Sequence, residues 1–157
     1  MKRLTKTQMK EYYNLILKFI LWDLAAYHLL IGFIGMFYEQ ELEEIAHTVF
    51  NIPITITPEI LWIIKPAAAY VFVFGIFMGV AAYNPQKYRA VIYAGLVVLA
   101  LRLVQYIQFN FTSVGVDAGH LWHTIVLMFV VILTGGIVLF LTIVSKPDSK
   151  NIKKEKS

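Results

Sequence analysis

The sequence predicts an all-α integral membrane protein, a four-helix bundle of up-down-up-down topology that forms one domain over residues 1–157. Composition is the first reason. Hydrophobic residues make up 59% of the chain and charged residues 15%, whereas a soluble domain carries about 25% charged residues. A soluble protein of this size has too small an interior to bury so much apolar surface. The second reason is that the apolar residues gather in four stretches of about 20 residues, the length of a helix that crosses a bilayer.

The four predicted membrane helices cover residues 19–37, 60–83, 90–109 and 121–144. An even number of crossings puts both chain ends on one side, and the basic residues identify that side as cytoplasmic. Of the 14 lysines and arginines, 12 precede the first helix, connect the second to the third or follow the fourth. We therefore expect a multi-pass protein of the plasma (inner) membrane with both termini in the cytoplasm. The net charge of +4 reflects this topology, and no element for reading or stacking on nucleic acid is present.

The first membrane helix carries a stripe of small residues, Ala25, Gly32 and Gly35, together with His28. Residues 39–50 follow it, with apolar residues at helical spacing and glutamates between them, which indicates a short amphipathic helix on the outer surface. Thr57 and Pro58 are typical of the first residues of a helix. Because small side chains let backbones approach closely, the first and second membrane helices should touch in a compact bundle.

The second membrane helix adds Gly75 and Gly79, a small-xxx-small pair of the kind found where membrane helices associate. Residues 146–157, after the fourth membrane helix, are rich in lysine, and we expect a disordered basic tail there.

Six polar residues of the sequence are expensive to place in a bilayer: Asp23, His28, Lys65, Arg102, His120 and His123. Arg102 lies too deep to reach water easily, and Asp23 lies about 10 Å deeper on the cytoplasmic side by helical rise, too far for a direct ion pair. We expect an outer-leaflet polar pocket that binds a lipid or a quinone. Its predicted lining is Arg102, Gln105, Tyr106, His123 and His28. The alternative is an internal hydrogen-bond network that only holds the bundle together.

Two cofactor hypotheses involve the histidines. Asp117, His120 and His123 lie at spacings of three residues, at which neighbouring side chains of a helix can share a metal ion. A haem held by His28 and His123 is disfavoured, because the two histidines differ in depth by about 10–15 Å. The chain has no cysteine, so disulfides, thiolate metal sites and iron–sulfur clusters are excluded. No arrangement of nucleophile and base indicates catalysis.

Residues 80–102, VAAYNPQKYRAVIYAGLVVLALR, join two helices through a tight Asn-Pro-x-Lys-x-Arg turn, and Trp122-His123 opens the last helix. This part of the chain, covering the second to fourth membrane helices, resembles the BphX-like and DoxX-like group of small four-helix bacterial membrane proteins. The acidic outer loop has no counterpart in that resemblance. The resemblance implies a four-helix architecture and an accessory role in membrane electron transfer from thiosulfate to quinone.

The expected function is that of a non-catalytic membrane subunit, which packs against partner membrane proteins or copies of itself and holds a lipid or quinone. Two other classes stay open at this point. One is a redox, metal-binding or haem-binding membrane protein that uses His28, His120, His123 and Asp117. The other is a small oligomeric transporter in which Arg102 binds an anion.

Overall fold

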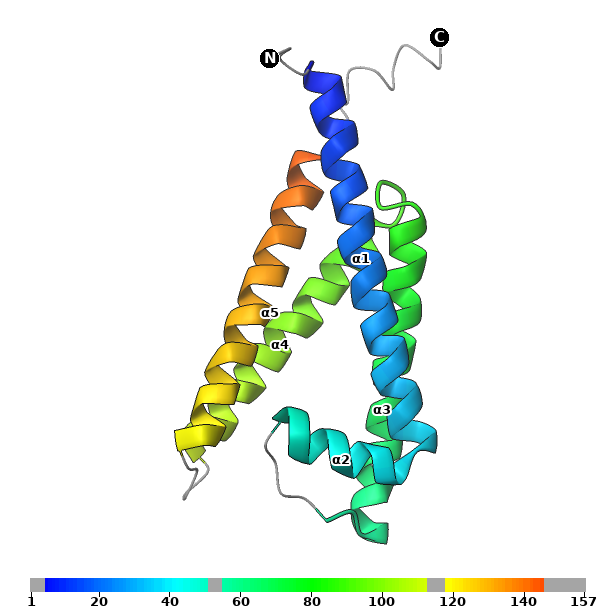
Figure 1. Ribbon diagram of the computed structural model, residues 1–157. Coiled ribbons are helices and arrows are strands. Elements are labelled where there is room, and N and C mark those ends of the chain that lie inside the picture. Colours follow the sequence, from blue (N-terminus) through cyan, green and yellow to red (C-terminus); the bar gives the residue numbers. More distant parts are fainter. Residues whose placement is uncertain (1–4, 51–54, 113–117, 146–157) are drawn as a thin grey trace.

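The structure, a computed structural model, describes residues 5–50, 55–112 and 118–145. Within these ranges the chain is all-α and contains no strand. The helices are α1 (Lys6–Phe37), α2 (Glu39–Phe50), α3 (Pro58–Tyr83), α4 (Arg89–Thr112) and α5 (Ala118–Val144), shown in Figure 1. The basic tail predicted at residues 146–157 lies outside the described residues.

The helix α1 begins well before the apolar stretch that predicted a membrane segment from residue 19. A capping box at Thr5 explains this early start: the Gln8 backbone N–H donates to the Thr5 hydroxyl, and the Thr5 backbone N–H donates to the Gln8 side chain at 2.9 Å. At α3 the predicted start is confirmed, because the Thr57 hydroxyl accepts from the Ile60 N–H and Pro58 opens the helix. Hydropathy marks the part of a helix that suits lipid, whereas caps set its ends.

Close packing of α1 against α3 is the most extensive helix contact in the described structure. A methyl group at Gly32 would come within 2.5 Å of the Phe72 backbone nitrogen, and one at Gly75 within 2.8 Å of the Leu29 nitrogen. Both glycines therefore face the other helix directly. Gly79 differs, since a methyl group there would meet only ordinary contacts at 3.7 Å or more. The predicted contact between the first two membrane helices is confirmed, although Gly79 is not required for it.

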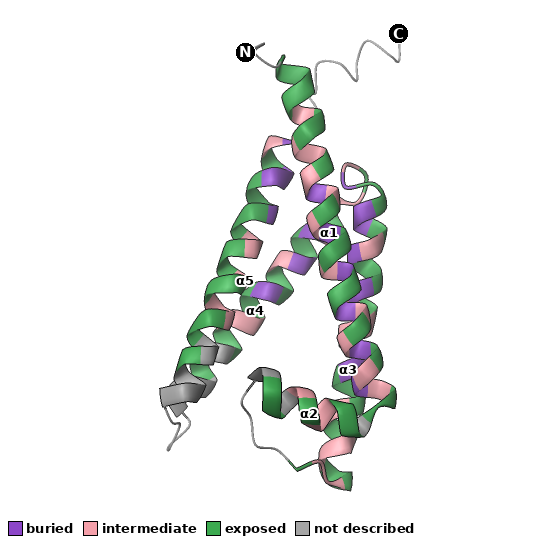
Figure 2. Cartoon of the chain, viewed as in Figure 1, coloured by how far each residue is buried: buried purple, intermediate pink, exposed green. Residues whose placement is uncertain are grey.

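The helices form two pairs that converge at one end and diverge toward the other (Figure 1). The pairs are α1 with α3 and α4 with α5. They meet where α1 begins and α5 ends, and α2 lies across the wide end, in contact with α1 and α5. The core cluster is Leu17, Leu21, Ala25, Met78, Ala81, Ala82, Ile92, Val138 and Leu141. Figure 2 shows buried residues along the α1–α3 contact and at the converging end. The compact packing predicted for the whole bundle is thus confined to these regions.

The helix α4 leaves α3 beyond the turn (Figure 1), and polar side chains line the gap that opens. Near the turn, a methyl group at Gly95 would come within 2.7 Å of the Met78 side chain, so the two helices are close there. Two turns further on, Arg102 and Gln105 face the space between the pairs. Polar side chains of α4 therefore line the gap between the helix pairs.

Gln86, in the turn between α3 and α4, ties the converging end together. Its side-chain amide donates to the Asn14 side chain of α1 at 3.2 Å and to the Ser145 carbonyl at the end of α5 at 2.8 Å. Its carbonyl oxygen accepts a hydrogen bond from the Arg89 guanidinium at the start of α4. One side chain thereby joins segments from three parts of the sequence.

In the described part of the chain, three helices are long and apolar enough to cross a membrane: α1, α3 and residues Ile125–Val144 of α5. Large apolar side chains also point outward from them, with Trp62 84% and Phe19 76% exposed. Such surface suits lipid, because soluble monomers rarely expose large contiguous apolar patches. The protein is a helical membrane protein. The helix α4, which matches the third predicted crossing, is not among these three, and it carries Arg102, Gln105 and Gln108.

Candidate functional site

A polar cavity of about 530 Å³ lies between the two helix pairs, and all four long helices contribute to its wall. A volume of this size is in the range of small-molecule sites. Most of the lining is apolar. The polar side chains of the wall are Asp23, Tyr27, His28, Arg102, Gln105 and Thr134. An adjoining hollow of about 400 Å³ on the α3–α4 side shares His28, Arg102 and Gln105 with it.

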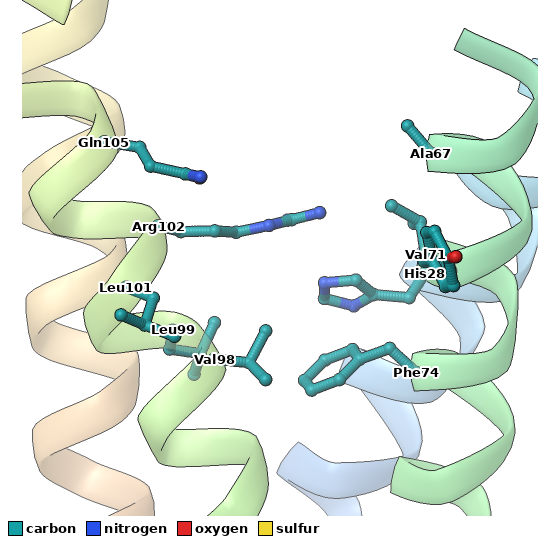
Figure 3. Close-up of a pocket in the computed structure, with 10 residues that line it drawn as sticks. His28, Ala67, Val71, Phe74, Val98, Leu99, Leu101, Arg102 and Gln105 are labelled. Atoms are coloured by element: carbon teal, nitrogen blue, oxygen red, sulfur yellow. The ribbon is translucent and has the colours of Figure 1, made fainter. Parts of the chain in front are cut away.

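Arg102 extends from α4 into the space between the pairs, toward His28 on α1 (Figure 3). Gln105, one turn along α4, points into the same space. Arg102 is half-buried. It forms no hydrogen bond or ion pair with any residue in the described ranges, and its charge acts on His28. A guanidinium has five N–H donors and no acceptor, so the donors of Arg102 are directed into the cavity.

His28 offers a hydrogen-bond acceptor to the same cavity, whereas Arg102 offers donors. Its Nδ1 lies 2.7 Å from the Leu24 carbonyl oxygen, and because a carbonyl only accepts, Nδ1 carries the hydrogen. In the neutral ring this leaves Nε2 as an acceptor. The ring is 3% exposed and is held edge-on between Tyr27 and Phe74, with centroid distances of 5.1 and 4.7 Å. The orientation of His28 is therefore set by its own helix and by α3.

Asp23 lines the same cavity as Arg102, without pairing with it. It lies five residues before His28, about 7.5 Å along the axis of α1. The absence of an ion pair between these two described residues agrees with the depth argument made from the sequence. That argument nevertheless left Asp23 out of the pocket, whereas the structure places it in the wall. Tyr27 lies four residues after Asp23, one helical turn, and also belongs to the wall. This spacing places both side chains on one face of α1, so the sequence could have indicated that they line the same cavity.

Of the predicted ligand-binding residues, Arg102, Gln105 and His28 are brought together in one cavity. Tyr106 and His123 belong to α4 and α5, but their side chains lie outside the described residues. The predicted metal site also falls outside the described residues, because the structure describes neither Asp117 nor the side chain of His120. Among the described residues, no group of three histidine, aspartate or glutamate side chains could hold a metal ion. Thr134 of α5 also lines the cavity.

Comparisons with protein-family models, with curated proteins and with solved structures find no match for this chain. The resemblance to BphX-like and DoxX-like proteins therefore stays a prediction, and the site has to be interpreted from its own residues.

Proposed function

We propose that this chain is a small, non-catalytic subunit of the plasma (inner) membrane, with both termini in the cytoplasm and α4 as a fourth crossing beside α1, α3 and α5. The distribution of basic residues supports this orientation. The contact of α4 with the spanning helix α5 supports the fourth crossing. The exposed apolar faces of its helices pack against lipid, partner membrane proteins or copies of the same chain. An accessory role in membrane electron transfer is the biological setting that the family resemblance implies.

The subunit binds an amphiphile, a lipid or a quinone, in the cavity between the helix pairs. The observation that carries this proposal is the half-buried guanidinium of Arg102, which faces the cavity and has no partner among the described residues. A charge within a membrane costs about 2.5–3.5 kcal/mol unless it is paired or hydrated. A phosphate or carbonyl oxygen of a ligand would accept hydrogen bonds from Arg102 and Gln105. The apolar walls would hold its hydrocarbon tail.

The experiment is native mass spectrometry of the purified full chain with its co-purified lipids and quinones. We expect a bound species in the wild type, weaker retention in Arg102→Lys, which keeps the charge but loses the planar fork, and loss in Arg102→Leu. The mass of the bound species distinguishes a lipid from a quinone. Lys65→Leu is the matched control, since it removes a cation from α3 at a position outside both cavities.

Two results would contradict the proposal. One is an Arg102→Leu protein that retains the same species as the wild type, which would leave Arg102 with a structural role only. The other is a Soret band or a stoichiometric metal in the purified wild type, which would favour the redox class that uses the histidines. A third result concerns folding. If Arg102→Leu does not fold and Arg102→Lys retains the bound lipid or quinone as well as the wild type does, Arg102 has a structural role and not a ligand-binding one.

A further inference from the structure

Two side chains of opposite charge, from different helices, face one cavity and do not form an ion pair with each other. Asp23 of α1 and Arg102 of α4 both line the cavity of about 530 Å³. Neither forms a hydrogen bond or an ion pair with a residue in the described part of the chain. Asp23 is exposed and Arg102 is half-buried, so each can be reached from the cavity.

The two charges lie at different levels along the helices. His28, which faces Arg102 across the gap (Figure 3), lies five residues after Asp23, an axial offset of about 7.5 Å. Ionised groups at membrane depth are normally paired with one another or with backbone carbonyls. A cavity wall that holds a cation and an anion apart is therefore complementary to a ligand that carries both charges.

We propose that the cavity selects a zwitterionic headgroup of the phosphoethanolamine type, with its phosphate on Arg102 and its ammonium group on Asp23. The inference rests on the proposed function, because it assigns the chemical class of the ligand that Arg102 binds. The phosphorus and nitrogen of this headgroup are about 4–5 Å apart by standard bond lengths. With one charge-assisted hydrogen bond of about 2.8 Å at each end, the headgroup is long enough to span the axial offset of about 7.5 Å between Asp23 and the level of His28. A quinone has no cationic group for Asp23, and an anionic lipid would meet the Asp23 charge with repulsion.

The order of the two charges also suggests how such a lipid lies. Asp23 precedes His28 on α1, so it is nearer than Arg102 to the end where α1 begins and α5 ends (Figure 1). A bound headgroup therefore has its ammonium group on the side of the chain termini and its phosphate further from them.

The test mixes the delipidated full chain in detergent with equal amounts of phosphatidylethanolamine and phosphatidylglycerol of the same acyl chains. Native mass spectrometry then measures the fraction of protein that carries each lipid. We expect the wild type to favour phosphatidylethanolamine about tenfold, the effect of one hydrogen bond between charged groups. Asp23→Asn should reduce that preference to within about twofold, while Asp23→Glu should keep it. Glu59→Gln is the matched control, because it removes an exposed carboxylate that does not line the cavity.

Free phosphoethanolamine, added in excess to the lipid-bound protein, distinguishes the two sources of the headgroup. Displacement of the lipid identifies the headgroup alone as sufficient, and retention identifies a membrane lipid as the ligand; both support recognition of the zwitterion. Equal binding of the two lipids by the wild type, or an unchanged preference in Asp23→Asn, would overturn this inference. If both lipids bind equally and both are lost in Arg102→Leu, the proposed function survives without it. If neither lipid nor any quinone binds the wild type, the proposed function itself fails.

Discussion

Gly32 of α1 lies against the backbone of Phe72 of α3, so closely that a methyl group at position 32 would stand 2.5 Å from the Phe72 nitrogen. No real Cβ contact is that short, so a side chain here would force the helices apart. Between membrane helices there is no hydrophobic effect to compensate for lost contact, and van der Waals packing has to supply the association. The contact at Gly32 is therefore a sensitive point for the stability of the α1–α3 pair.

Gly32→Ala should destabilise the protein by about 1–3 kcal/mol, because the added methyl group overpacks a contact between two backbones. The measurement is the melting temperature in detergent. Gly79→Ala is the matched control, since its methyl group would meet Trp22 and Ala25 at ordinary distances of 3.7 and 3.8 Å. Alanine favours a helix over glycine by about 0.5–1 kcal/mol, so this control should melt at the same temperature or slightly higher. Equal losses in both variants would mean that the close approach at Gly32 is not what stabilises the pair.

Gln86→Leu should also lower the melting temperature, because it removes the hydrogen bonds to Asn14, Ser145 and Arg89 at once. Leaving part-buried partners unsatisfied costs about 1–3 kcal/mol. Lys87→Ala changes the next residue of the same turn, whose side chain is exposed, and should have little effect. If the two variants melt alike, the converging end is held by its apolar core alone.

Labelling of single cysteines tests the orientation in the membrane, and the cysteine-free chain provides a clean background. Glu44→Cys places a thiol at an exposed position of α2, and Lys87→Cys places one in the turn between α3 and α4. We expect a membrane-impermeant maleimide added to intact cells to label position 44 and not position 87. Lysed cells should show labelling at both. The reverse pattern in intact cells would place the termini outside.

His28→Phe separates the packing role of this residue from its hydrogen-bonding role. A phenyl ring preserves the edge-on contacts with Tyr27 and Phe74, whereas the acceptor nitrogen that faces Arg102 is lost. We expect a melting temperature close to that of the wild type and retention of the ligand within about twofold by native mass spectrometry, because a phosphate or carbonyl oxygen has no hydrogen to donate to Nε2. A loss of retention would show that the ligand also contacts His28. A large drop in melting temperature with unchanged retention would show that His28 acts only in packing.

The sequence determined those features that depend on a single helix and its immediate neighbours. The apolar stretches predicted a membrane protein. The glutamates and apolar residues of residues 39–50 predicted the short helix α2, and Thr57 with Pro58 predicted the start of α3. The small-residue stripe on α1 predicted the contact with α3. Each of these features follows from local periodicity or from capping, which a sequence shows directly.

The site was predicted in part, for the same reason. Arg102, Gln105 and His28 were identified because a charged or polar residue deep in an apolar stretch has to face the protein interior. Asp23 was left out because its depth ruled out a direct ion pair with Arg102, whereas a cavity can be lined by residues at different depths. The cavity that holds both Asp23 and Arg102 exists because α4 diverges from α3 beyond the turn.

Only the tertiary structure decided that divergence. The separation of two helices depends on all the side chains at their crossing and on the rotation of each helix about its axis. No single residue of the sequence determines either of these. The helix α4 is close to α3 at Gly95, lies apart from it at Arg102 two turns later, and packs against α5. The tertiary structure also decided that α1 requires a glycine at position 75 of α3 but not at position 79. Because the axes of α1 and α3 cross at an angle, residues four positions apart on α3 lie at different distances from α1.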